Sequence, residues 1–205
     1  MAKAYFIGGA PRVGKTTTLK ELVKQKALFG ASADAIRHSI RGVLSAEDKP
    51  ELFKIARGAF SSPENVENMR RKPKVVVEHQ NNESEVVWKS VIDFVNFSIE
   101  DGQDIGVEGV AIFPHNFTTE MSFEYKVVFI VNLQDQTETI LRHAHENTFD
   151  WLHKYDDEII RAFCVFDLEL NKYYFKEAKK YNLPIVTVEE DFSKSVNEAV
   201  KVLIN

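Results

Sequence analysis

The sequence predicts an α/β domain in which a parallel β-sheet carries helices on both faces. Short apolar runs alternate with segments of helical periodicity along the whole chain, and the first run leads directly into a glycine-rich loop and a helix. Strands that alternate with helices pair in parallel, because each helix carries the chain back across the sheet. A length of 205 residues favours a single domain spanning residues 1–205.

Five apolar runs are candidate strands. Residues 4–8 form a continuous apolar segment, which is typical of a buried parallel strand. Residues 27–32 are a weaker second candidate. Residues 105–112 and 126–133 are the third and fourth, and residues 184–188 are the last.

Segments of helical periodicity separate the strands. The first follows residue 14 and places Leu19, Leu22 and Val23 on one face. We expect further helices over residues 36–44, 50–60 and 84–99, and an interrupted one over residues 137–181. A last helix is expected at Ser195, because Ser195 and Glu198 have the spacing of a capping box. Residues 70–74 indicate a basic loop, and residues 78–82 a polar loop that either caps a helix or lines a pocket.

Composition narrows the class of protein. The net charge is −5 and the pI is about 5.7, so the chain has no overall basic field to attract nucleic acid or an anionic membrane. The chain has no apolar run of membrane-spanning length and no signal-peptide pattern, from which we expect a cytoplasmic protein. Cys164 is the only cysteine, and we expect it to be a small buried hydrophobe. Six histidines are present, but their spacing does not suggest a metal site.

A phosphate-binding loop follows the first strand. Residues 9–16 match the pattern G-x-x-x-x-G-K-[ST] and read Gly9-Ala10-Pro11-Arg12-Val13-Gly14-Lys15-Thr16. Glycines let successive backbone N–H groups curl round a phosphate, and the helix that follows directs its positive end at the same group. Lys15 is expected to reach the β- and γ-phosphates, Thr16 to ligate Mg²⁺ and Thr17 to contact the α-phosphate. We therefore expect a nucleotide site.

Three residues after the second strand are candidates for the acceptor side of a phosphoryl transfer. Asp34 follows the end of that strand, and Arg37 and Arg41 lie one and two helical turns further on. A carboxylate near a γ-phosphate orients or accepts the proton of an attacking hydroxyl. Two arginines on one face grip an anionic substrate. The alternative is an N-cap followed by solvated surface arginines.

Further candidates lie in and after the later strands. Glu108 interrupts an apolar strand, and a buried carboxylate needs a partner, so we expect it to hold a substrate hydroxyl or a Mg²⁺-bound water. Gly109 would let a ligand approach the backbone closely. Arg142, with Arg161 as a second candidate, is expected to act as a lid arginine that neutralises the transferring phosphoryl group.

These segments together resemble the small P-loop kinases of the 2-phosphoglycerate kinase and zeta-toxin-like group. The resemblance rests on the phosphate loop, on residues 32–41 and on residues 102–114. It implies a three-layer P-loop NTPase fold with a five-stranded parallel sheet, ATP and Mg²⁺ as cofactors, and a small-molecule acceptor. It also implies that Asp34 is the catalytic base and that Arg37 and Glu108 bind the acceptor. We expect a substrate-binding helical region over residues 34–103 and a lid over residues 136–164.

The leading hypothesis is thus an ATP-dependent phosphotransferase, and two alternatives remain open. A nucleoside or nucleotide kinase would need a ring to stack on its base, for which Phe60, Trp88 and Phe113 are candidates. A nucleotide-dependent regulatory ATPase would use Glu108 to polarise water and the helical region to bind a protein. A GTPase is disfavoured, because residues 132–135 lack the guanine-reading pattern. We expect the adenine near residues 189–193.

Overall fold

The computed structural model describes residues 2–55 and 57–205. Its five strands are β1 (Lys3–Gly8), β2 (Phe29–Ser32), β3 (Ile105–Gly109), β4 (Glu124–Val131) and β5 (Ile185–Thr187). They form one parallel sheet in the order β2-β3-β1-β4-β5. The strand that precedes the phosphate loop therefore lies at the centre, and the carboxyl ends of its neighbours flank the loop. All five predicted strands are confirmed, within a few residues at their ends.

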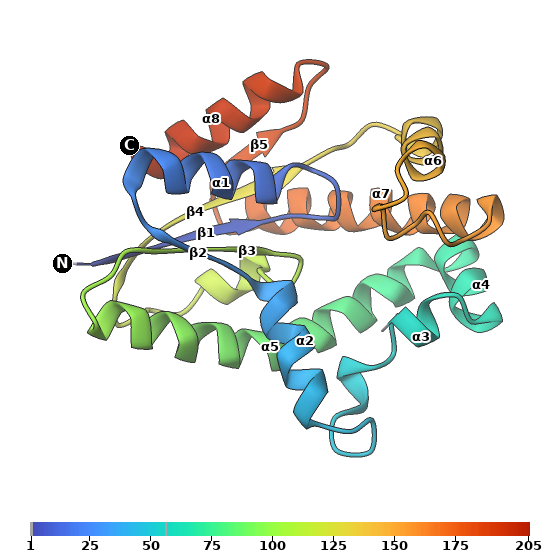
Figure 1. Cartoon of the computed structure of the whole chain (residues 1–205), viewed down its shortest axis with the longest axis horizontal. Coiled ribbons are helices and arrows are strands. Elements are labelled where there is room, and N and C mark those ends of the chain that lie inside the picture. The colour runs from blue at the N-terminus through green and yellow to red at the C-terminus, as the bar shows by residue number, and fades with distance from the viewer. Residues whose placement is uncertain (1, 56) are drawn as a thin grey trace.

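Helices cover both faces of this sheet (Figure 1). On one face lie α1 (Lys15–Lys26) and α8 (Phe192–Ile204), and on the other lie α5 (Pro73–Glu100) and α7 (Asp157–Lys180). The sheet's inner strands are almost fully buried between these layers, with Phe6, Ile7 and Val107 having no exposed surface. Burial on both faces explains why these strands have continuous apolar sequences rather than alternating ones.

A group of shorter helices extends beyond one end of the sheet. It consists of α2 (Ala33–Val43), η1 (Pro50–Leu52), α3 (Arg57–Phe60), α4 (Pro63–Arg71) and the first turns of α5. Of these elements, α4 and α5 pack against α7. Phe60 of α3 packs against Trp151, which lies in the segment that joins α6 (Thr137–Glu146) to α7. Their position at the carboxyl end of the sheet is where α/β folds bind ligands.

Two helical predictions were wrong in extent. α5 begins at Pro73, so residues 78–82 lie inside a helix and not in a loop. Proline suits the first turn of a helix, and the buried positions Val76, Gln80, Ser84 and Val87 continue the helical spacing. Polar residues at buried positions hid this periodicity. The basic residues at 70–74 are likewise divided between the end of α4 and the start of α5.

Helix boundaries elsewhere also differ from expectation. Residues 50–60 contain η1 and α3 and not one continuous helix, and Ala56 lies outside the described residues. The last helix begins at Phe192, with Asp191 as its N-cap accepting a hydrogen bond from Lys194 N. Ser195 is inside that helix and buried, where its hydroxyl accepts from Glu189 N. The capping box at Ser195 was therefore a wrong prediction.

Cys164 is buried, as expected, and burial raises the pKa of its thiol to about 11. None of the described helices combines the length and the apolar character that crossing a membrane requires.

Candidate active site

The phosphate loop has the backbone that its glycines predict. Gly9 and Gly14 have φ angles of 147° and 96°, which L side chains rarely adopt. A Cβ on Gly9 would collide with the carbonyl oxygen of Ile130, and one on Gly14 would lie 2.8 Å from the Phe192 ring. Arg12 also has a positive φ, of 63°, which is uncommon for arginine and found at strained functional loops.

Lys15 and Thr16 begin α1 and face the end of β3. The Lys15 amine is buried and donates to Ala10 O at 2.6 Å, and the Thr16 hydroxyl donates to Glu108 at 3.1 Å. Burial lowers the pKa of Lys15, against the opposing effect of the Glu108 and Asp34 carboxylates. Burial raises the pKa of Glu108, and the nearby Lys15 amine and the Thr16 hydroxyl counteract it. The loop, the lysine and the β3 carboxylate thus form one polar cluster.

Arg12 links the phosphate loop to the segment between α6 and α7. Its guanidinium donates to both oxygens of Asp150, at 2.5 and 2.6 Å. Asp150 also accepts from Leu152 N, and its Oδ2 lies 2.7 Å from His143 Nδ1. Burial disfavours the charged form of Asp150, but these partners, Arg12 first, hold its pKa below the usual value. Both contacts come from Arg12 Nη2, and this charge-assisted pair holds the two side chains together.

Two pockets meet at the phosphate loop. The first has a volume of about 550 Å³ and lies between the loop, α2 and the helices beyond the sheet. The second has about 400 Å³ and lies between the loop, α6 and the start of α8. The residues that line both are Pro11, Arg12, Lys15 and Thr16. We name the first the acceptor-side pocket and the second the nucleotide-side pocket. Both are within the usual size range of small-molecule sites.

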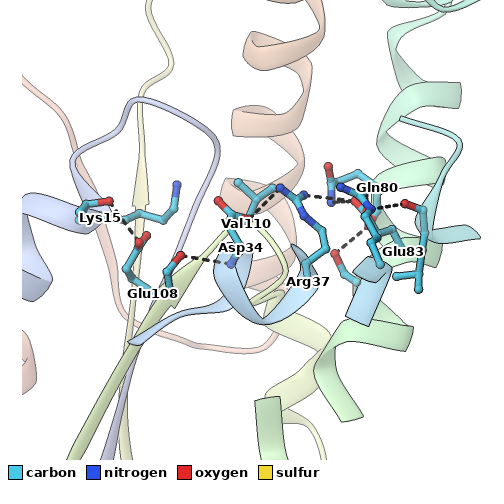
Figure 2. A network of polar contacts seen from close by, with 12 residues as sticks. Lys15, Asp34, Arg37, Gln80, Glu83, Glu108 and Val110 are labelled. Carbon is cyan, nitrogen blue, oxygen red and sulfur yellow. Dashed lines mark hydrogen bonds and ion pairs between the residues drawn. The ribbon is translucent and has the colours of Figure 1, made fainter. Parts of the chain in front are cut away.

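The acceptor-side pocket contains the predicted cluster after β2 (Figure 2). Asp34 lies in the first turn of α2, whose N-cap is Ser32. Arg37 is within 3.3 Å of Asp34 and within 3.4 Å of Glu83, while Arg41 pairs with Glu83 and donates to Leu52 O at 2.5 Å. Glu83 is fully buried on α5 and also accepts from Gln80 at 3.0 Å.

The sequence allowed two interpretations of this cluster: acceptor-site residues, or an N-cap followed by solvated arginines. Asp34 and Arg37 line a pocket next to Lys15, which favours the first interpretation. Arg41 is not a solvated arginine either, but its guanidinium is committed to Glu83 and a backbone carbonyl. Two carboxylates thus face the two arginines, Glu83 both of them and Asp34 only Arg37, which argues against the expectation that both arginines are free to grip an anionic substrate.

Gly109 and the two predicted lid arginines, Arg142 and Arg161, line neither pocket. A Cβ on Gly109 would lie 2.7 Å from the Cβ of Ala33, so this glycine admits α2 to the sheet and not a ligand. Arg142 is exposed on α6 and lines neither pocket, although its neighbour His143 lines the nucleotide-side one. Arg161 is exposed and donates to Glu138 at 2.9 Å. Neither arginine is next to Lys15.

Of the three aromatic residues expected to stack on a base, one lines a pocket and two lie in the core. Phe60 lines the acceptor-side pocket, while Trp88 packs on Phe6 and Phe113 stacks on Tyr174 within the core. On the nucleotide side, Phe192 lines the pocket beside Gly14. Phe192 lies within residues 189–193, where we expect the adenine, and that placement stays a prediction.

Three carboxylates were missed by sequence reasoning: Glu83, Asp150 and Asp167. Asp167 lies within an apolar stretch of α7, the same signal that singled out Glu108, and it lines the nucleotide-side pocket. Its Oδ2 accepts from Asn171, while its Oδ1 is buried without a hydrogen-bond partner among the described residues. Burial raises the pKa of Asp167 to about 7. No sequence signal marks Asp150, whose partner Arg12 is 138 residues away.

The residues present fit a nucleotide phosphate group and Mg²⁺. The strained backbone at Gly9 and Gly14 forms a turn that leads into the N-terminus of α1, which favours an anion. The Thr16 hydroxyl and the Glu108 carboxylate are oxygen donors of the type that Mg²⁺ prefers, directly or through water. Within the described residues, no group of three or more His, Cys, Asp or Glu forms a separate metal site.

Comparison with solved structures establishes the fold. A shikimate kinase from Bacteroides thetaiotaomicron is 14% identical, with a TM-score of 0.53 over 100% of this chain and 99% of that one. A sugar kinase from Janibacter sp. HTCC2649 is 14% identical, with a TM-score of 0.52 over 100% of this chain and 95% of that one. No family model and no curated protein matches the sequence. The chain thus has the three-layer α/β fold of P-loop kinases, and the predicted fold class is confirmed.

Proposed function

We propose that the protein is an ATP-dependent kinase that transfers the γ-phosphoryl group of ATP to a hydroxyl of a small molecule. One observation carries the proposal. Lys15 and Thr16 line both the nucleotide-side and the acceptor-side pocket, so two ligands would meet at the phosphate loop. The fold shared with a shikimate kinase and a sugar kinase is consistent with this.

The phosphate loop would hold the nucleotide. Backbone N–H groups of the loop residues 9, 10 and 12–14 and the N-terminus of α1 would surround the β-phosphate. Lys15 would exchange its bond with Ala10 O for phosphate oxygens, and Thr16 and Glu108 would hold Mg²⁺. Bound there, Mg²⁺ neutralises charge on the phosphates. Thr17 and Phe192 line the same pocket, toward the α-phosphate and the base.

The acceptor would lie on the other side of Lys15. Its hydroxyl oxygen forms a bond to the γ-phosphorus, the bond from that phosphorus to the β-phosphate oxygen breaks, and ADP leaves. Asp34 would orient the hydroxyl and take its proton. Arg37 would hold a second oxygen of the acceptor. Lys15 and Arg12 are the two positive side chains that line both pockets, so they would stabilise the charge that develops on the transferring group.

Arg12 would thus perform the role that we first expected of a lid arginine. Asp150 lies in the segment between α6 and α7, which belongs to the predicted lid of residues 136–164. Its carboxylate accepts from Arg12 and so holds the arginine in place. Arg142 would need a movement of α6 to reach the phosphates, and we retain it only as a group that contacts nucleotide in a closed form.

The test is Mg²⁺-dependent consumption of ATP with a panel of sugar acids, polyols, nucleosides, nucleotides and phosphorylated hydroxy acids, with products identified by mass. We expect one acceptor class to gain a phosphoryl group, and the gain to disappear in Asp34→Asn. Asp93→Asn, an exposed carboxylate change on α5, is the matched control. ATP hydrolysis that ignores every acceptor and persists in Asp34→Asn would instead indicate a regulatory ATPase.

A further inference from the structure

The wall of the acceptor-side pocket that faces away from the phosphate loop is aromatic. Phe60 from α3 lies 5.2 Å from Trp151 and 5.3 Å from Tyr155, measured between ring centroids. Phe163 of α7 lies 5.3 Å from Trp151 in an edge-on arrangement, and Phe166 lines the pocket beside it. Trp151 and Tyr155 are only partly buried, so their rings border the open space. Such a wall suits a flat ring.

The charges in the same pocket cancel. Apart from Arg12 and Lys15 of the phosphate loop, the arginines and lysines that line it are Arg37 and Arg41, among the residues the structure describes. These two face the carboxylates of Asp34 and Glu83. Glu83 has no exposed surface and could not withdraw to free an arginine, because an unpaired buried charge is costly. Beyond Arg12 and Lys15 of the phosphate loop, a phosphorylated or carboxylated acceptor would therefore meet only arginines that are already paired with carboxylates.

The polar end of the acceptor-side pocket places a hydrogen-bond donor, Arg37, beside a hydrogen-bond acceptor, Asp34. Arg37 Nε is buried and makes no hydrogen bond within the described part of the chain. The buried Asp34 Oδ1 has an ion pair with Arg37 Nη2 at 3.3 Å, and no hydrogen bond among the described residues completes its shell. A neutral hydroxylated compound satisfies both groups, since a hydroxyl donates to the carboxylate and an oxygen accepts from the guanidinium.

We propose that the acceptor is a nucleoside: an uncharged sugar whose hydroxyls meet Asp34 and Arg37 and whose planar base lies against Phe60, Trp151 and Tyr155. The inference rests on the proposed function for its use of the bound nucleoside, but the binding itself is testable without phosphoryl transfer. It excludes the phosphorylated hydroxy acids that the first resemblance suggested. Gln80 lines the pocket as a polar group for the edge of the base.

The two tryptophans allow a direct binding test. Trp151 borders the pocket, whereas Trp88 packs against Phe6 and Phe117 on the other side of α5. In full-length Trp88→Phe protein, the indole emission reports Trp151 alone. Titration with adenosine, guanosine, cytidine, uridine and thymidine is expected to quench it saturably for at least one of them. Free ribose, which has hydroxyls but no base, is expected to bind at least tenfold more weakly.

Variants locate the site. Phe60→Leu is expected to weaken nucleoside binding about tenfold, the scale of one lost base–aromatic stack, and Asp34→Asn to weaken it by a similar factor. Phe149→Leu is the matched control, because Phe149 is 97% exposed and next to the aromatic wall in sequence. ATP binding, measured separately by calorimetry, is expected to be unchanged in Phe60→Leu.

The outcomes separate the two proposals. Saturable nucleoside binding without phosphorylation would retain the pocket assignment and overturn the kinase function. Phosphorylation of a hydroxy acid or a sugar phosphate, with no nucleoside binding, would retain the kinase function and overturn the nucleoside assignment. Nucleoside monophosphates that bind tenfold more tightly than nucleosides would also overturn it, because the neutral charge balance predicts the reverse order. Binding unaffected by Phe60→Leu would place the nucleoside elsewhere and contradict the assignment.

Discussion

The nucleotide side and the acceptor side meet at one loop but are built in different ways. On the nucleotide side, consecutive residues 11–17 provide half of the pocket, mostly through backbone and short side chains. On the acceptor side, the side chains come from α2, α3, α4, α5 and α7, and their partners lie far apart in the chain. A site that depends on a local backbone shape can be recognised from a short sequence motif. Acceptor specificity depends instead on contacts between residues that are far apart in the sequence.

The largest effect should come from the shared residue Lys15. We expect Lys15→Ala to lower phosphoryl transfer by at least about 10³-fold, the scale for removing a charged group that stabilises the transferring phosphoryl. Steady-state kinetics with the identified acceptor measure this. Lys20→Ala, an exposed change on the same helix, should leave the rate unchanged. Retention of full activity in a folded Lys15→Ala protein would contradict the role of the loop on both sides.

Asp34→Asn should affect the acceptor side alone. We expect a loss of about 10²-fold or more in kcat, because the amide cannot accept the hydroxyl proton. The KM for ATP should stay within about twofold, as Asp34 does not line the nucleotide-side pocket. Initial-rate measurements that vary each substrate separate these effects. An equal rise in the KM for ATP would show that the two sides are not independent.

On the nucleotide side, Asp167 should make stability depend on pH. In the folded chain, burial keeps the Asp167 carboxyl protonated up to a pKa of about 7, whereas in the unfolded chain this group loses its proton near its ordinary pKa of 3.8. The folded state thus binds the extra proton, and the free energy of unfolding should fall as pH rises, by about 2 kcal/mol between about pH 5 and about pH 7. Urea unfolding measures this dependence. Asp167→Asn should flatten it, and exposed Asp101→Asn should not.

The smallest effect should come from the link between Arg12 and Asp150. We expect Asp150→Asn to lower kcat/KM for ATP about tenfold, because it removes the carboxylate that positions Arg12, and Arg12→Ala to lower it further, because it removes the cation itself. The double variant should be no worse than Arg12→Ala alone, since Asp150 acts through Arg12. Asp157→Asn, which disturbs an exposed pair with His145 in the same region, is the control. Additive losses would mean that the two residues act separately.

The same contrast explains what the sequence could predict. The central strand, the loop and the start of the first helix could be predicted from residues 4–16, because the motif is local and its glycines are needed for positive φ angles. Glu108 and Asp167 both place a carboxylate in an apolar run, so that signal was present for each. Glu83 was missed because α5 was expected to begin at residue 84. Beyond that boundary, its pairing with Arg37 and Arg41 depends on how α2 packs on α5, which no local pattern encodes.

The predicted lid shows what the sequence could not predict. An arginine after the fourth strand was expected to face the phosphates, yet Arg142 is exposed and Arg12 of the loop lines both pockets. Helical periodicity predicted that α6 exists but not which turn of it faces the loop. The carboxylate that holds Arg12 comes from the irregular segment after α6, where spacing rules do not apply.

The division of the site into a nucleotide side and an acceptor side is tested most directly by a crystal structure with ADP and Mg²⁺. We predict the β-phosphate at the backbone N–H groups of residues 9, 10 and 12–14, the base beside Phe192, and the aromatic wall of Phe60 and Trp151 free of nucleotide. An ADP base lying between Phe60 and Trp151 would contradict the division, because the pocket assigned to the acceptor would then be the nucleotide's own.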